Sequence, residues 1–378
     1  MRKRNIVYAV ICLCIIVVLV AYSISTFHIF KSGTEVEHSK LILIRGDGAT
    51  FPEPQIQAWI NTYISIKKNV KIEYVGVGSG QGQSDFIKGI VDFAVSDPPL
   101  KSDKWKEAVE KYGKVYQFPI IAGAVAIVYN VPEITNAYHL KLSPSVLADV
   151  LLGKITYWDD NRIKGLNPNV ADKLPHKEVI FVHRSDSSGT TQIFTTYLSL
   201  ISDEWKNTVG SGKIVKWPLD AIGRRLGAKG NPGVASTVKS TPYSMGYVEL
   251  AFTKDLGVVA LQNRDGNFVI PSEESIKESL KHVSYVLPSP DENWDKYNIL
   301  EKILNPPGEN SYPIIAFSHL IIKDANNYSK DVAKALADLI EWILTEGQRD
   351  DYIVEGYVAL PPEIAEIGLK IANELRKS

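Results

Sequence analysis

The sequence predicts an α/β protein in which polar turns at the ends of strands bind a ligand. Three strand–turn–helix units lead to this prediction, because in each of them a strand pattern feeds a turn rich in Gly, Ser or Thr. The three turns are Gly46–Pro52, Gly76–Gly82 and Arg184–Thr190. Ligands of open α/β sheets bind at the carboxyl ends of the strands. We therefore expect ligand binding at these turns.

The composition sets limits on size and partners. With 378 residues, of which 45% are hydrophobic and 22% charged, the chain is long enough for about two domains. A net charge of −1 without a long basic block argues against nucleic acid as a partner. Both cysteines, Cys12 and Cys14, lie in the first apolar run, and the seven histidines show no metal-ligand spacing. We expect no metal and no cofactor.

The N-terminus has a pattern typical of a membrane-spanning segment. Basic residues at positions 2–4 precede an uncharged stretch that is apolar from Ile6 to Ile24, about the length that spans a bilayer. The basic flank stays in the cytoplasm by the positive-inside rule, which places the rest outside. No Ala-x-Ala-like cleavage site follows, so residues 1–30 are expected to be an uncleaved transmembrane anchor in the cell membrane. The alternative is a cleaved signal peptide. Residues 31–40 form a polar tether.

The first part of the remaining chain alternates between strands and helices. Residues 41–44 are a continuous apolar run, which is typical of a buried strand, and Pro52 and Pro54 fit only at the start of the helix that follows. The next strands are expected at 70–75 and 91–96, with a helix at 83–90 between them.

Four elements are clearest in the second part. Residues 118–130 form a long apolar run, expected to be a strand that passes between two lobes with Gly123 near the crossing. Ser143 opens a helix that Gly153 ends, and residues 312–323 return to a strand pattern. Ser329 caps a final amphipathic helix that stops at Gly347. Three tryptophans, which we assign to packing, are Trp158, Trp205 and Trp217.

The turn after the strand at 178–183 has the features of an anion site. Free N–H groups at a helix start attract an oxyanion, and Arg184 offers a fork that matches phosphate-like oxygens. Ser188, Gly189 and Thr190 add two hydroxyls and a position where the backbone can approach closely. The alternative is that Asp186 or Ser187 merely caps an ordinary helix.

Short motifs in a fixed order point to a family. They are Gly48–Pro52, Gly78-Ser79, Val91–Phe93 with Ser96-Asp97, Leu152–Ile155 with Trp158–Asp160, Arg184–Thr190, Glu204–Asn207, Val215–Pro218, Lys229–Asn231 and Gly246–Glu249. Through these motifs the chain resembles the phosphate-binding proteins (PstS type) of phosphate ABC importers, from about Leu41 to Leu360. The resemblance implies an extracytoplasmic protein, not an enzyme, that captures inorganic phosphate in an interlobe cleft. The uncleaved anchor expected from residues 1–30 departs from the family's freely diffusing periplasmic pattern.

The resemblance also implies the fold and the partners. The expected fold is a two-lobed periplasmic-binding-protein-like fold (type II), in which each lobe is a mixed sheet flanked by helices. Lobe one would combine 41–123 with 317–378, lobe two would span 124–316, and a hinge would close them. We expect a monomer that delivers phosphate to ABC permease subunits and is held at the membrane by the N-terminal helix.

The family's site residues carry over position by position. Asp186 would pair with Arg184 and hold it. Asp97 would select phosphate, because a buried carboxylate accepts the proton of a phosphate P–OH and repels sulfate, which has none. The residues expected to contact the anion are Thr50, the backbone N–H of Phe51, Ser79, Asp97, Arg184, Ser188, Gly189 and Thr190.

Two further departures from the family pattern lie beyond the anchor. Asp47 occupies a position where the family has a small residue, and residues 220–226, with Arg224 and Arg225, are longer than the usual stretch. Two alternatives to a phosphate carrier remain: a secreted phosphatase, or a binding protein for another oxyanion such as sulfate or molybdate. For the first, His183 is the nearest candidate base, and strand alternation points it away from Arg184.

Overall fold

The computed structural model has two units, residues 1–40 and residues 41–378. Most of the expected anchor at 1–30 and the tether at 31–40 lie outside the described residues, although residues 17–22 are helical. No helix among the described residues has both the length and the apolar character needed to cross a bilayer. The described stretches are residues 17–22, 41–283 and 287–377.

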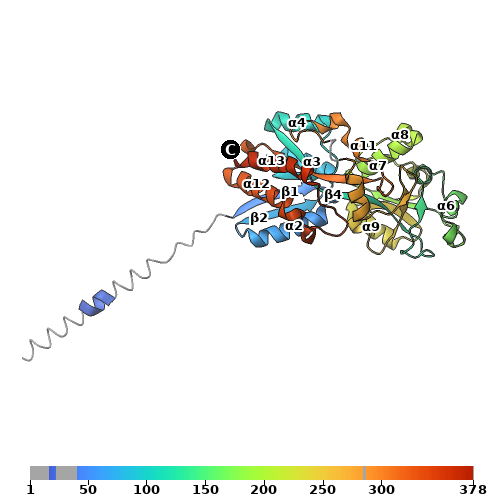
Figure 1. The fold of residues 1–378 in the computed structure, drawn as a ribbon, viewed down its shortest axis with the longest axis horizontal. Coiled ribbons are helices and arrows are strands. Elements are labelled where there is room, and N and C mark those ends of the chain that lie inside the picture. The colour runs from blue at the N-terminus through green and yellow to red at the C-terminus, as the bar shows by residue number, and fades with distance from the viewer. Residues whose placement is uncertain (1–16, 23–40, 284–286, 378) are drawn as a thin grey trace, which may run out of the picture. The chain divides into compact units, whose positions relative to one another are not determined.

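A mixed sheet of nine strands runs through the second unit (Figure 1). β1, β2 and β3 are parallel to one another, as are β6, β7 and β8, whereas β4 and β12 run antiparallel to their neighbours. The strands in spatial order are β2 (Val70–Gly76), β1 (Ile42–Gly48), β3 (Phe93–Ser96), β12 (Ile315–Lys323), β4 (Val115–Asn130), β8 (Ser244–Glu249), β6 (Ile180–Arg184) and β7 (Arg225–Ala228), with β9 (Gly257–Val258) on β4.

β4 joins the two halves of this sheet. Its residues up to Ala124 pair with β12, and those from Val125 onward pair with β8. Gly123 lies at the change of partner, as the sequence predicted, and a Cβ there would lie 2.8 Å from the ring of Phe51. A glycine is therefore needed where the chain crosses. Val358 bridges to the neighbouring Ala122, which brings a third segment to the crossing.

Helices cover both faces of the sheet, as expected of an α/β fold. Phe93 and Val95 of β3 pack in the core that includes α2 and α12, whereas Ala94 faces α3 and α4. A small sheet of β5 (Lys141–Leu142), β10 (Ala260–Gln262) and β11 (Phe268–Val269) lies apart. The helices are α2 (Glu53–Ile66), α3 (Ser79–Lys88), α4 (Ser102–Tyr112), α5 (Pro144–Leu151), α6 (Asn161–Leu166), α7 (Gly189–Ile201), α8 (Asp203–Thr208), α9 (Gly230–Ser240), α10 (Glu273–Leu280), α11 (Ile299–Ile303), α12 (Lys330–Leu344) and α13 (Pro362–Arg376).

Several predicted element ends are confirmed. The N–H of Val146 donates to the Oγ of Ser143, and the N–H of Val332 donates to the Oγ of Ser329, so both serines cap their helices. β2 follows the predicted alternation of buried and exposed residues. The three tryptophans assigned to packing are buried in the core.

Three boundary predictions were wrong. β1 runs on to Gly48, and Leu43 is 40% exposed, so this strand alternates and is not buried throughout. α3 begins at Ser79 instead of Gln83, so Gly82 lies inside the helix and not in the turn before it. A Cβ at Gly82 would lie 2.4 Å from the Cα of Gly48, so this glycine serves helix–strand packing. α12 is also not the last helix: α13 follows it, and this amphipathic helix was not predicted from the sequence.

Candidate functional site

The two sets of parallel strands end at one junction. The N–H of Gly80, after β2, donates to the carbonyl of Ser187, after β6, at 2.9 Å. The N–H of Asn231, after β7, donates to the Oγ1 of Thr50, after β1, at 3.1 Å. Turns from both halves of the sheet therefore meet at this junction, which includes all three turns that the sequence predicted to bind a ligand.

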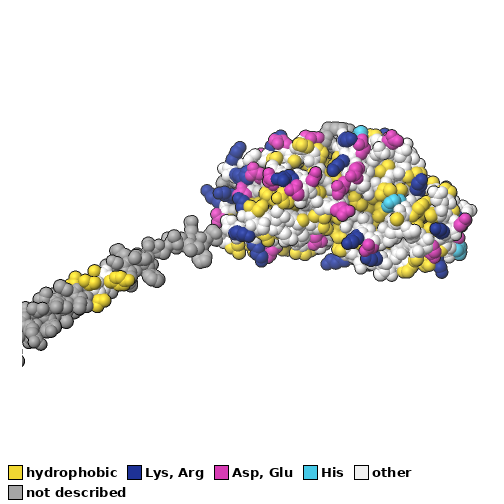
Figure 2. Space-filling model, turned by 60° about the horizontal axis from the view of Figure 1, so that its bottom comes forward, with side chains coloured by type: hydrophobic (Ala, Val, Ile, Leu, Met, Phe, Trp, Pro, Cys, Tyr) yellow, Lys and Arg dark blue, Asp and Glu magenta, His cyan; other side chains and the backbone are white. Residues whose placement is uncertain are grey.

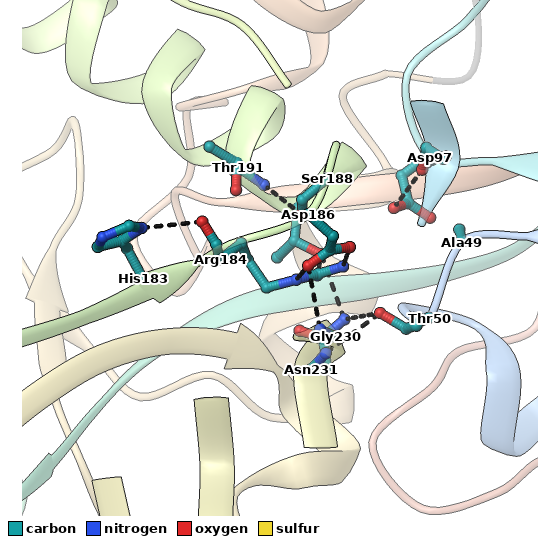
Figure 3. A network of polar contacts seen from close by, with 12 residues as sticks. Ala49, Thr50, Asp97, His183, Arg184, Asp186, Ser188, Thr191, Gly230 and Asn231 are labelled. Atoms are coloured by element: carbon teal, nitrogen blue, oxygen red, sulfur yellow. Dashed lines mark hydrogen bonds and ion pairs between the residues drawn. The ribbon is translucent and has the colours of Figure 1, made fainter. Parts of the chain in front are cut away.

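Arg184 is the cation of the junction. It ends β6, is 5% exposed, and donates through Nε to Asp186 Oδ1 at 2.8 Å and through Nη2 to Asp186 Oδ2 at 2.5 Å (Figure 3). Its Nη1 donates to Thr190 Oγ1 at 3.2 Å. The N–H of Gly230 also donates to Asp186, at 3.0 Å. Burial alone would raise the pKa of Asp186, but these hydrogen bonds and the Arg184 charge hold it below its ordinary value, so the ion pair is stable and the guanidinium orientation is fixed.

The start of α7 supplies free N–H groups. Ser188 is the N-cap, because its Oγ accepts from the N–H of Thr191 at 3.1 Å. The alternative in which Asp186 or Ser187 caps this helix is therefore wrong. The N–H groups of Gly189 and Thr190 belong to the first turn, where a helix offers no backbone acceptor. They remain suited to an anion, which the helix dipole also favours.

Gly189 brings α7 into close contact with the other half of the sheet. A Cβ at this position would lie 2.3 Å from the Oγ of Ser79 and 2.4 Å from Oδ2 of Asp97. Gly78, with φ of +94°, makes a similar approach, since a Cβ there would lie 2.6 Å from Oδ2 of Asp186. Side chains at these positions would push the two halves apart.

Asp97 is the buried acid of the junction. It follows β3, is 1% exposed, and accepts from the Oγ of Ser318 at 2.8 Å and from the Oγ of Ser79 at 3.3 Å. Burial raises its pKa to about 7, although these two hydrogen bonds and the charges of Arg184 and Lys213 act in the opposite direction. A pKa in this range makes both the neutral and the ionised carboxyl accessible near neutral pH.

Thr50 and Asn231 connect the two halves. Thr50 does not cap α2, whose N-cap is Pro52, and its Oγ1 accepts from both the N–H and the Nδ2 of Asn231. Asn231 Nδ2 also donates to Thr190 Oγ1 at 3.2 Å. Asn231 was not among the predicted site residues; its place in the Lys229–Asn231 motif was the available signal.

All eight residues predicted to contact an anion lie buried at or beside this junction. The arrangement combines one guanidinium, four hydroxyls, N–H groups at a helix start and one carboxyl. Such a set fits a tetrahedral oxyanion that carries at least one proton for the carboxyl to accept. In the part of the chain that the structure describes, no group of three His, Cys, Asp or Glu residues is placed to bind a metal ion.

Asp47 and residues 220–226, which depart from the family pattern, take no part in the junction hydrogen bonds described above. Burial and the adjacent carboxyl of Asp85 together raise the pKa of Asp47 to about 7, and Asp85 lies on α3, so Asp47 faces that helix. Asp220 pairs with Arg225, which begins the edge strand β7 beside β6. The longer loop thus leads into a strand of the sheet.

His183 points away from Arg184, as strand alternation predicted. Its ring packs against Phe181 and Trp217, and its Nδ1 lies 2.8 Å from the carbonyl oxygen of Arg184 (Figure 3). Burial lowers its pKa. It is therefore not placed to activate Ser188 as a base.

Comparison with known proteins identifies the family. The chain matches the PBP superfamily domain over residues 31–346. It is 51% identical over 346 residues to a phosphate-binding protein PstS of Methanocaldococcus jannaschii, covering 90% of this chain and 88% of the relative. A PstS protein of Haemophilus influenzae is 40% identical over 325 residues, covering 85% and 90%.

Solved structures share the fold. A high-affinity periplasmic phosphate-binding protein with bound phosphate superposes with a TM-score of 0.66 at 21% identity, covering 88% of this chain and 93% of that one. A putative phosphate ABC transporter substrate-binding protein of Clostridium perfringens gives a TM-score of 0.58 at 17% identity, covering 84% and 100%. These matches and the sequence identities above agree: the chain belongs to the PstS-type phosphate-binding protein family within the PBP superfamily.

Proposed function

We propose that this chain is an extracytoplasmic solute-binding protein that captures inorganic phosphate and delivers it to an ABC importer. The observation that carries the proposal is Asp97, a buried carboxyl that lies among donors and beside the Arg184 charge. Phosphate at neutral pH offers it a P–OH, whereas sulfate leaves it unpaired. The names of the relatives support the same ligand.

The contacts follow from the junction. One side would bind phosphate through Thr50, the Phe51 N–H and Ser79, and the other through Arg184 and the start of α7. Lobe one would comprise 41–123 with 317–378 and lobe two 124–316. The change of partner in β4 supports a hinge at this boundary.

Residues 1–30 would anchor the protein in the cell membrane, with 31–40 as the tether and the rest outside the cytoplasm. The basic flank and apolar run of the sequence support this arrangement. The protein would act as a monomer beside its permease. Both charge signs are interspersed over the face in Figure 2, which fits a ligand bound by local contacts and not by the overall field.

The alternatives find no comparable support. A phosphatase would need a base beside Ser188 or Thr190, and His183 is turned to Trp217. A sulfate or molybdate carrier would leave Asp97 without a proton donor from its ligand.

Calorimetric titration of the full chain in detergent, after removal of bound phosphate by mild unfolding and refolding, tests the proposal. We expect 1:1 phosphate binding and no sulfate heat at pH 8. Equal binding of both anions, or silence toward phosphate, would refute it. Protease accessibility of the 31–40 segment in intact cells would test the anchored, external arrangement separately.

A further inference from the structure

Lys213 is attached to the start of α7 through its backbone. It lies between α8 and β7, and its carbonyl accepts from the N–H of Ser188, the cap of α7, at 3.0 Å. The preceding Gly212 donates its N–H to Thr195 of α7 at 3.1 Å. The backbone position of Lys213 is therefore fixed relative to the free N–H groups of the junction.

The Lys213 side chain crosses to the other half of the sheet. Its Nζ donates to Oε1 of Gln83, which lies on α3 and is 1% exposed. The Gln83 Nε2 donates to the Oγ of Ser96 at 2.8 Å and to the carbonyl of Pro98 at 3.3 Å. A carbonyl only accepts hydrogen bonds, so the amide is oriented with Oε1 toward the ammonium group.

The Lys213 charge acts on the acid of the junction. Its positive charge lowers the pKa of Asp97, which Ser96 and Pro98 flank in sequence. Burial in turn lowers the pKa of Lys213 to about 7, and Lys101 adds to this effect. Burial disfavours an ammonium group in this position, so a bound anion would stabilise its charge.

We propose that Lys213 and Gln83 form a clasp, a hydrogen-bonded pair that holds the two sides of the junction together over the bound anion. This inference rests on the proposed phosphate-binding function. The pair joins segments from opposite halves, so it forms on closure and breaks on opening. Lys213 is not among the residues expected to touch phosphate, so its role is to retain the ligand.

Phosphate release from the full chain in detergent tests the clasp. Radiolabelled phosphate is bound, excess unlabelled phosphate is added, and the rate of loss is measured for wild type and for Lys213→Met, which keeps a long side chain without the charge. We expect release to accelerate roughly tenfold, the lower range for a charge-assisted hydrogen bond, with association changed less than about twofold.

Three further variants separate the clasp from a general charge effect. Lys213→Arg should restore slow release, and Lys216→Met, which removes an exposed lysine three positions on, should release at the wild-type rate. Gln83→Met should resemble Lys213→Met, and the double variant should be no faster than either single one, since they remove the same contact. The melting temperature of the phosphate-free protein should stay within a few degrees for Lys213→Met, whereas a merely structural role would lower it.

The outcomes distinguish the two proposals. If wild type binds phosphate and Lys213→Met releases it at the wild-type rate, the clasp is overturned and the phosphate-binding function stands. Equal acceleration in Lys216→Met, or additive effects of the Lys213 and Gln83 variants, also overturns the clasp. Wild type that binds no phosphate overturns the function, and the clasp with it.

Discussion

Replacement of Asp97 by Asn changes one oxygen of the buried carboxyl into an NH2 group and removes its charge. With the two halves in contact, burial raises the pKa of Asp97 from 3.8 to about 7, which corresponds to roughly 4 kcal/mol of unfavourable free energy for the ionised carboxyl. The amide removes this penalty and so stabilises the folded protein. Part of the stabilisation is lost, because Ser318 and Ser79 donate more weakly to an amide than to a carboxylate. We expect the variant to be more stable than wild type by about 2 kcal/mol at pH 8.

The sign of the pH dependence follows from the raised pKa. The folded protein holds the Asp97 proton more tightly than the unfolded chain, so wild-type stability falls as pH rises from about 4 to 7. The amide carries no such penalty. The advantage of Asp97→Asn should therefore be complete above pH 7 and shrink as pH falls toward 4. Urea unfolding of phosphate-free protein at pH 8 and pH 5 measures it.

Selectivity should change in the same variant. Wild type should prefer phosphate over sulfate by a factor of roughly 10⁴ or more at pH 8, because sulfate leaves a buried acceptor unpaired. The amide can donate to a sulfate oxygen, so the preference should fall below roughly 10². Titration calorimetry with both anions measures this ratio, and Asp103→Asn, at an exposed position of α4, is the control. Undiminished exclusion of sulfate, or a loss of stability at pH 8, would refute the reasoning.

Other changes at the junction have distinct expected results. Gly189→Ala should weaken phosphate binding by at least about 100-fold in titrations, because its Cβ would overlap Asp97; undiminished affinity would argue against this close approach. Arg184→Lys should weaken binding by about 10- to 100-fold in the same assay, since a lysine cannot make the two-pronged contact with Asp186; an unchanged affinity would argue against the assigned cation. Asn231→Ala should speed phosphate release about tenfold in the radiolabel assay through loss of its contacts across the junction, and no change would show that these contacts do not hold it closed. Sulfate binding to wild type should strengthen as pH falls below 7, when Asp97 is protonated; calorimetry at pH 8 and 5.5 compares the two, and a flat profile would contradict the raised pKa.

The sequence by itself determined the parts that depend on neighbouring residues. Strand and helix periodicity located β2, α2 and the long strand β4, and Ser143 and Ser329 marked helix starts, because caps and amphipathic patterns are local. The pairing of Arg184 with Asp186 is likewise local, with one residue between them. Parallel strands end at a common edge, so the turns that follow them could be assigned to one site.

Only the tertiary structure decided which distant groups share this site. Thr50 and Asn231 are 181 positions apart, and Asp97 and Ser318 are 221 apart, so no local pattern brings them together. The raised pKa of Asp97 also depends on packing, because desolvation comes from the segments that surround the carboxyl and not from its sequence neighbours. The link between Lys213 and Gln83, 130 positions apart, exists for the same reason: two halves of a sheet, joined through β4, bring their strand ends to one junction.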